Sequence, residues 1–389
     1  MTNKIKNVPK LRFPEFKGEW GSIELGNIAE NYTGGGTPST KVKEYWEGNI
    51  PWIQSSDLKI DDVKNVEFHK YINSVAIENS SAKLIPENSI AIVTRVGVGK
   101  LALIRDEFST SQDFLSLSNL LIDTNYALYA LYKLIRKEST KLQGTSIKGL
   151  TKNDLLRKQI KKPLDINEQE QIGYFFSKLD RQIELEEQKL AKLEEQKKGY
   201  MQKIFSQELR FKDESGNEYP EWEEKKLFNV VKYLSSKRSS NYYSEDIIHG
   251  QYPVYDAVQE ISRDTNFDIE ESYISILKDG AGVGRLNLRP GKSSVIGTMG
   301  YLLPQNIDIK FLFYYLKTMN FNRFVIGSTI PHLYFKDYSK ETILIPIDKS
   351  EQIKIGSFFI KLDSIINNKA KKIKVLKQRK QGFLQKMFI

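Results

Sequence analysis

Two stretches of the 389-residue chain decide the fold: PLDINEQEQIGYFFSKLDRQI at 163–183 and PIDKSEQIKIGSFFIKLDSII at 346–366. They align without a gap at a constant offset of 183 residues. The alignment continues to GYMQKIF (199–205) and GFLQKMF (382–388). Such dense identity indicates an internal duplication, so the chain consists of two related halves.

The repeated stretches have the periodicity of long helices. Apolar residues recur in steps of three and four from Ile172 and from Ile355, and neither run contains a proline. A stripe this narrow on so long a helix needs a partner to cover it. We therefore expect two long antiparallel helices, coiled-coil-like and related by a pseudo-twofold axis. Charged residues interrupt the apolar seam at Glu186, Lys197, Lys369 and Lys380.

The segments in front of these helices favour an α+β fold. Each has short β-rich runs, such as 89–94 and 273–277, and one helical stretch, at 125–139 and 308–320. The opening LRFPEFKGEW (11–20) recurs more loosely as LRFKDESGNEYPEW (209–222), and GTSIKGLTKND (144–154) pairs with GSTIPHLYFKD (327–337). The predicted organisation is two α+β domains, 1–164 and 207–347, each followed by a long helix, 165–206 and 348–389.

The middles of the two halves differ. Residues 31–119 and 233–303 share little beyond IVTRVGVGKLAL (92–103) and ILKDGAGVGRLNL (276–288). The second string contains DGAGVG, but a phosphate-binding glycine loop must open a helix, and here an alternating RLNLRPG follows. We interpret both strings as strand-to-strand loops inside divergent inserts.

Composition excludes several classes of protein. The chain has no cysteine and only three histidines, His69, His249 and His332, so disulfides, thiol nucleophiles and Cys- or His-built metal centres are not expected. It has no apolar run of about 18 residues and no apolar signal segment at its start, which predicts a soluble cytoplasmic protein. No Walker-type phosphate loop or methyltransferase signature is present, so we expect no cofactor, no metal and no catalytic activity.

The net charge of +10 is unevenly placed. Residues 349–389 carry 11 basic and 2 acidic residues, whereas 165–206 carry 7 basic and 9 acidic ones. A basic excess is typical of nucleic-acid binding. A basic helix that faces an acidic helix, or a solvated surface, explains the same numbers.

Polar and aromatic loops are the remaining candidates for function. Arg, Lys, Asn and Gln pair with base edges, and Ser, Thr and Tyr commonly hold phosphates. Trp46 and Trp52 fit a core or rim position better than a base contact. The predicted DNA-binding residues of the first half are Thr37, Ser39, Lys41, Gln54, Ser55, Arg95 and Lys100. Those of the second half are Lys237, Arg238, Asn241, Tyr255, Lys278, Arg285 and His332.

The whole pattern resembles the DNA-specificity (S) subunit of type I restriction–modification enzymes. The resemblance rests on LRFPEFKGEW, on GGGTPS…YWEGNIPWIQSSDL (34–58), and on the twice-used P-x-D-x-x-E-Q…I-G-x-F-F-x-K-L-D. It covers essentially the whole chain. It implies two target-recognition domains that each read half of a split, asymmetric site on double-stranded DNA. It also implies that the helices set the spacing and dock two methyltransferase subunits, to which restriction (motor) subunits add.

Two other interpretations stay open at this point. One is a non-catalytic protein–protein scaffold, in which a coiled-coil hairpin carries two binding domains. The other is an enzyme that binds a nucleotide through a glycine loop. Binding to a random duplex library would separate the first from a DNA reader, and titration with nucleotides would test the second.

Overall fold

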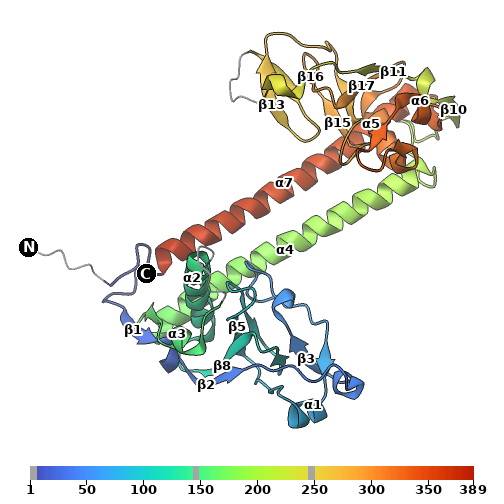
Figure 1. Cartoon of the computed structure of the whole chain (residues 1–389). Helices are drawn as coiled ribbons and strands as arrows, with labels where there is room; N and C mark the ends of the chain where they lie inside the picture. The colour runs from blue at the N-terminus through green and yellow to red at the C-terminus, as the bar shows by residue number, and fades with distance from the viewer. Residues whose placement is uncertain (1–6, 143–148, 244–249) are drawn as a thin grey trace, which may run out of the picture. The chain divides into compact units, whose positions relative to one another are not determined.

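The computed structural model describes residues 7–142, 149–243 and 250–389, and the chain divides into two compact units (Figure 1). The first unit comprises Met1–Glu186 with Lys372–Ile389, and the second comprises Glu187–Lys371. Each of the two long helices, α4 (Ile166–Phe205) and α7 (Lys349–Met387), has one part in each unit.

A four-stranded antiparallel sheet of order β2-β8-β5-β6 forms the centre of the first unit. A smaller sheet has the order β4-β3-β7, in which β3 and β7 run parallel, and β1 pairs with β9. The strands are β1 Gly21–Glu24, β2 Ala29–Gly34, β3 Ile50–Ile53, β4 Tyr71–Ile72, β5 Ser89–Val93, β6 Leu101–Ile104, β7 Ser109–Thr110, β8 Phe114–Leu120 and β9 Gln159–Lys162. The helices are α1 Ser74–Asn79, α2 Thr124–Leu142 and α3 Lys152–Leu156.

The alternation of side chains along β5 shows how this sheet is buried. Ile90 and Ile92 pack with α2 and with the adjoining ends of α4 and α7, whereas Ala91 and Val93 face a separate cluster that includes Ile53. Successive side chains of a strand point to opposite faces, so a strand covered on both faces has apolar residues at every position.

The second unit repeats this strand order. Its large sheet is β11-β17-β14-β15, its small sheet is β13-β12-β16 with β12 and β16 parallel, and β10 pairs with β20. The strands are β10 Trp222–Lys226, β11 Val231–Ser235, β12 Tyr252–Tyr255, β13 Glu260–Asp264, β14 Tyr273–Leu277, β15 Leu286–Arg289, β16 Ser294–Val295, β17 Met299–Pro304, β18 Val325–Ile326, β19 His332–Leu333 and β20 Thr342–Pro346. The helices are α5 Ile309–Thr318 and α6 Phe335–Tyr338.

Short 3-10 helices complete both units. They are η1 Leu25–Asn27, η2 Lys43–Trp46, η3 Ser55–Asp57, η4 Leu227–Asn229, η5 Ser240–Tyr243 and η6 Phe321–Phe324. The hairpin β18–β19 belongs to the second unit, and part of its sequence counterpart (144–154) lies outside the described residues, as does His249.

The predicted α+β class is confirmed. The strand at 273–277 is found as predicted, and the bounds of the strand at 89–94 and of the helices at 125–139 and 308–320 are each confirmed to within three residues. The two inserts differ in sequence, but the structure gives them one backbone plan, which the sequence comparison did not reveal.

The repeated Glu-Gln motif ties the start of each long helix to its unit. The Glu168 carboxylate, 1% exposed, accepts hydrogen bonds from the Arg12 guanidinium at 2.7 Å and from the Trp20 indole at 3.2 Å. Gln169 donates to the Pro163 carbonyl and accepts from the backbone N–H of Asp123. A buried carboxylate needs such partners, because an unpaired one is costly.

The second copy makes the same contacts. Glu351, fully buried, accepts from Arg210 and from Trp222, and Gln352 bridges Pro346 and Asp308. The repetition of these residues in the sequence is therefore explained by a repeated set of buried hydrogen bonds.

Glycine recurs one turn further along each long helix for a steric reason. A Cβ at Gly173 would lie 2.7 Å from the backbone N of Tyr126 in α2, and a Cβ at Gly356 would lie 2.8 Å from the backbone N of Phe311 in α5. Close approach of two helices requires residues without a side chain at such points.

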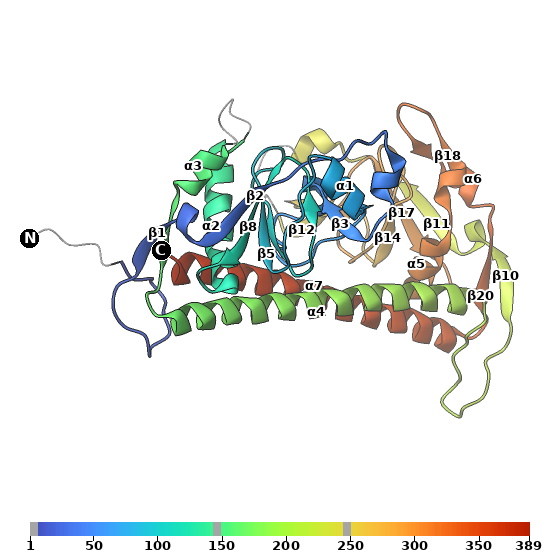
Figure 2. The same cartoon turned by 90° about the horizontal axis from the view of Figure 1, so that it is seen from below.

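The α4 and α7 segments pack antiparallel within each unit, and both views show them side by side (Figure 2). In the first unit Lys380, near the end of α7, pairs with Asp180, near the start of α4. In the second unit Lys197, near the end of α4, pairs with Asp363, near the start of α7. Among the described residues, no helix has both the length and the apolar character needed to cross a membrane.

Candidate nucleic-acid interface

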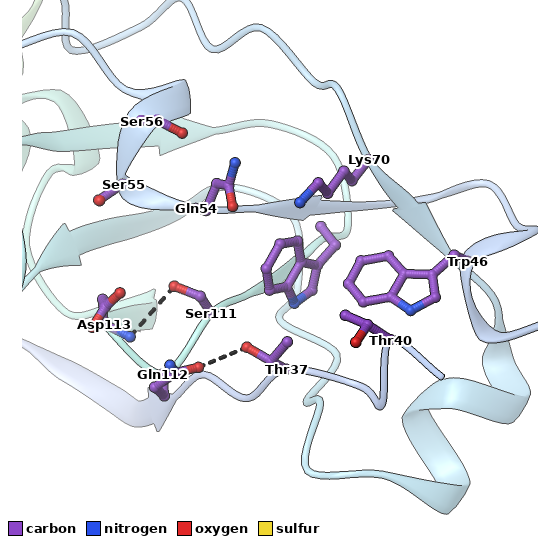
Figure 3. Close-up of a pocket in the computed structure, with 11 residues that line it drawn as sticks. Thr37, Thr40, Trp46, Gln54, Ser55, Ser56, Lys70, Ser111, Gln112 and Asp113 are labelled. Carbon is purple, nitrogen blue, oxygen red and sulfur yellow. Dashed lines mark hydrogen bonds between the residues drawn. The ribbon is translucent and has the colours of Figure 1, made fainter. Parts of the chain in front are cut away.

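Loops around the small sheet of the first unit enclose a polar hollow of about 370 Å³ (Figure 3). They come from the segment after β2, from η2, from the β3–η3 connection and from the segment between β7 and β8. The hollow is lined by Thr37, Thr40, Trp46, Trp52, Gln54, Ser55, Ser56, Lys70, Ser111, Gln112 and Asp113. The structure thus brings three of the predicted residues, Thr37, Gln54 and Ser55, into one site.

Two tryptophans form one wall of the hollow. The rings of Trp46 and Trp52 meet edge to face with centroids 5.1 Å apart. The Trp46 indole N–H donates to the Ser39 carbonyl and the Trp52 indole N–H to the Gly36 carbonyl, both in the segment after β2. Trp52 is buried and Trp46 is partly exposed, as expected for core and rim positions.

Lys70 lies over these rings. Its Nζ is 5.5 Å from the Trp52 ring centroid and 5.8 Å from that of Trp46, which is cation–π distance (Figure 3). Lys70 is not among the residues predicted from the sequence, because no recognisable motif surrounds it. Only the pairing of β3 with β4, in which the Trp52 N–H donates to the Lys70 carbonyl, brings it to the site.

Gln112 was also missed. Its side-chain carbonyl accepts a 2.6 Å hydrogen bond from the Thr37 hydroxyl, which leaves its NH₂ group as a donor on an exposed side chain. Gln112 also lines a second hollow of about 500 Å³, together with Arg95 and Lys152. It therefore stands between two adjacent hollows of the same unit.

The glycine loop between β5 and β6 is a hairpin turn, as predicted, because its strands pair antiparallel and Gly97 and Gly99 have positive φ angles of 91° and 114°. Lys100, at its end, donates from Nζ to the Ser55 carbonyl at 2.7 Å and so ties the turn to the hollow. Arg95 is exposed, and no ion pair of its side chain is found in the described part of the chain. Ser39 and Lys41 are exposed on the segment that follows β2.

In the second unit Arg238 is held inside the protein. Its guanidinium pairs with the carboxylates of Asp264 and Asp268 and donates to the Tyr243 hydroxyl at 2.8 Å, and its side chain is only 17% exposed. Burial alone would lower the pKa of Arg238, but these hydrogen bonds outweigh it and raise the pKa, so the group stays charged.

Lys278, Asp279 and His332 form a second, partly exposed cluster at the start of the β14–β15 turn. The Asp279 carboxylate pairs with the Lys278 ammonium and is 2.8 Å from His332 Nδ1. Burial alone would raise the pKa of Asp279, but the hydrogen bonds from Lys278 and His332 outweigh it and lower the pKa.

The other predicted residues of this unit lie nearer the solvent. Tyr255 is partly buried beneath the Arg289 guanidinium, which lies 4.2 Å from its ring centroid. Lys237, Asn241 and Arg285 are exposed. In the described residues, no group of three or more His, Asp or Glu side chains is arranged to hold a metal ion.

Comparison with known proteins agrees with the division of the chain into two related halves. The family model of the type I restriction modification DNA specificity domain matches residues 17–195 and again residues 219–378. The chain belongs to this family. Its two matches fall on the two halves of the duplication, and the chain is thus a type I specificity subunit.

Relatives of the specificity subunit match either nearly all of the chain or about half of it. The specificity subunit of the type I restriction enzyme MjaIX from Methanocaldococcus jannaschii is 26% identical over 411 residues, which cover 95% of this chain and 92% of the relative. That of EcoR124I/EcoR124II from Escherichia coli is 36% identical over 178 residues, 44% of this chain and 43% of the relative. The type I S subunit from M. genitalium has the same fold, with a TM-score of 0.67, 20% identity and coverage of 98% and 99% of the two chains.

Proposed function

We propose that the specificity subunit reads a split, asymmetric DNA site, and that the loops of each unit read one half. The observation that carries this proposal is the pair of identical strand orders that hold unlike loop side chains. One scaffold used twice with different loops is what a reader of two unlike half-sites needs.

The hollow of the first unit is our candidate for base recognition. Thr37, Gln54 and Ser55, joined by Gln112 and Lys70, offer hydroxyl, amide and ammonium groups at one opening. Amide and cationic side chains discriminate between base edges in the major groove.

We assign the exposed cations to the DNA backbone. Lys41 and Arg95 in the first unit and Lys237 and Arg285 in the second have exposed side chains. We propose that they contact phosphates, with Ser39 and Asn241 beside them. Binding should therefore weaken with salt.

The predicted residues that already have protein partners receive a different role. Lys100, Arg238, Lys278 and His332 are engaged in hydrogen bonds or ion pairs inside their units. We propose that they fix the shape of the recognition loops, and that Tyr255 does so through its contact with Arg289.

The repeated helices are our candidate surface for two methyltransferase subunits, with restriction subunits added to them. Each unit has the same partly buried aromatic cluster beside an exposed leucine, which supports two equivalent docking sites. The clusters are Phe13, Phe175 and Phe383 beside Leu11, and Phe211, Phe358 and Tyr200 beside Leu209. In this proposal the partners supply catalysis, and the boundaries 1–164, 165–206, 207–347 and 348–389 separate readers from helices.

An exchange of residues 1–150 with those of another specificity subunit tests the proposal. The expected result is a methylated sequence in which one half-site changes and the other is retained. A simultaneous change of both half-sites would contradict modular recognition.

A further inference from the structure

The apolar seam between α4 and α7 does not by itself select one alignment of the two helices. Its apolar residues recur in steps of three and four. A slip of seven residues therefore returns most of the apolar residues to apolar positions, and apolar contacts have no directional preference. Some other feature has to distinguish the observed alignment from its neighbours.

The first unit has a buried ion pair in the seam. The Lys380 ammonium is 2.5 Å from the Asp180 carboxylate, and Lys380 is only 4% exposed. The second oxygen of Asp180 accepts a 2.6 Å hydrogen bond from the Tyr129 hydroxyl. Burial, and then the charge of Asp180, raise the pKa of Tyr129 far above its usual value, so this hydroxyl remains a donor.

The second unit repeats the arrangement with the helices exchanged. Lys197 lies 2.5 Å from the Asp363 carboxylate, whose other oxygen accepts from the Tyr314 hydroxyl. On each helix the aspartate precedes the lysine by 17 residues, so the two pairs require the same alignment.

A slipped alignment would separate both pairs. A displacement of α7 by seven residues places Asp180 opposite Met387 in one direction and opposite Ile373 in the other, and both of these side chains are buried. By the internal repeat, Asp363 then meets the two equivalent apolar positions of α4. A carboxylate buried against apolar side chains loses its hydration without compensation.

We propose that these two ion pairs, each held by a tyrosine, select the alignment of α4 against α7, and that Asp180, Lys380, Lys197 and Asp363 are thereby positioning residues for the spacing of the two half-sites. The part that concerns spacing rests on the proposed function. The part that concerns alignment is independent of DNA.

Crosslinking tests the alignment, because the chain has no cysteine of its own. Glu186→Cys and Lys372→Cys replace two residues whose side chains are in contact, Nζ to Oε1 2.8 Å, and a short bis-maleimide should join them. Addition of Asp180→Lys should lower the yield at least about tenfold, and further addition of Lys380→Asp should restore it. The matched control is Arg181→Glu, at an exposed residue paired within α4, and should leave the yield unchanged.

Duplexes whose half-sites are separated by different spacers test the consequence, with the subunit assembled with its methyltransferase partner. Asp180→Lys should reduce the preference for the native spacer about tenfold, and the exchanged pair should recover it. If Asp180→Lys fails to fold, Tyr129→Phe provides a milder form with a smaller reduction. The proposal would be overturned if the crosslinking yield and the spacer preference were unaltered in these variants. It would also be overturned if the exchanged pair, Asp180→Lys with Lys380→Asp, recovered neither. A wild-type subunit without any spacer preference, but with the predicted crosslinks, would instead refute the split-site function.

Discussion

The small sheets of the two units have equivalent registers but different side chains. In the first unit Trp52 of β3 pairs with Ser109 of β7, and at the matching place in the second unit Val254 of β12 pairs with Ser294. Lys70, across from Trp52, corresponds to a serine across from Val254. The first unit thus has an aromatic ring with a lysine ammonium over it, where the second unit has a valine paired with a serine.

The segments that follow the first strand of each large sheet differ in the same way. After β2 the chain supplies Thr37 and Thr40 to an open hollow, whereas after β11 it supplies Arg238 to an internal ion-pair cluster. The buried strands therefore set the backbone plan, and the side chains available for recognition vary in the loops that leave these strands.

The shared frame gives the largest expected effect. Glu168→Ala and Glu351→Ala should each destabilise their own unit by about 3–5 kcal/mol, because a partly buried arginine and a buried tryptophan N–H both lose their acceptor. Hydrogen exchange read by mass spectrometry should show faster exchange in the affected unit. Equal acceleration in both units would mean that the frame is one cooperative structure instead of two.

Substitution of Arg238 should give the next largest loss of stability, and this loss should be confined to the second unit. Arg238→Ala removes the partner of Asp264 and Asp268 and should cost about 2–3 kcal/mol. Chemical denaturation, monitored by hydrogen exchange in residues 236–268, measures this loss of stability. The control is Lys237→Ala, at an exposed residue. A variant that retains stability but loses recognition would make Arg238 a direct base reader.

A smaller effect is expected at the hollow of the first unit. Gln112→Ala should relax a single base position, by roughly 1–3 kcal/mol of discrimination, with little loss of stability. Arg95→Ala is the matched comparison, and should weaken binding to all sequences alike and reduce the salt slope by about 1. Selection from a duplex library at two salt concentrations distinguishes them. Identical sequence profiles for wild type and Gln112→Ala would remove this residue from the site.

The smallest effect concerns acid stability of the second unit. The pKa of Asp279 is lowered in the fold, so its contribution is present above its unfolded pKa and is lost as the pH falls through the folded value. Wild type should therefore lose more stability than Asp279→Asn between about pH 5 and pH 2. Parallel losses in the two proteins would show that Lys278 and His332 do not stabilise the carboxylate.

The sequence predicted the frame better than the site, for physical reasons. The long helices follow from a local repeat, and Glu168 and Gly173 stand out because they occur twice. The common strand order of the inserts depends on pairing between segments that are distant in the sequence. This pairing depends more on which strands are buried than on the identity of particular residues, so unlike sequences form the same sheet.

Individual site residues were harder to predict. Thr37 and Gln54 belong to recognisable loops, and the structure brings them together, whereas Lys70 and Gln112 reach the hollow only through the pairing of β3 with β4 and β7. Arg238 is of a residue type that reads bases, but it forms ion pairs with acidic partners that lie 26 and 30 residues away in the chain. Such distant partners are not apparent from the sequence.

The most direct test of the central claim is to assemble the specificity subunit with its methyltransferase partner and to map the methylated positions across a genome. We expect one split motif, with two unlike half-sites at a fixed separation. A single continuous motif, or methylation without sequence preference, would contradict it.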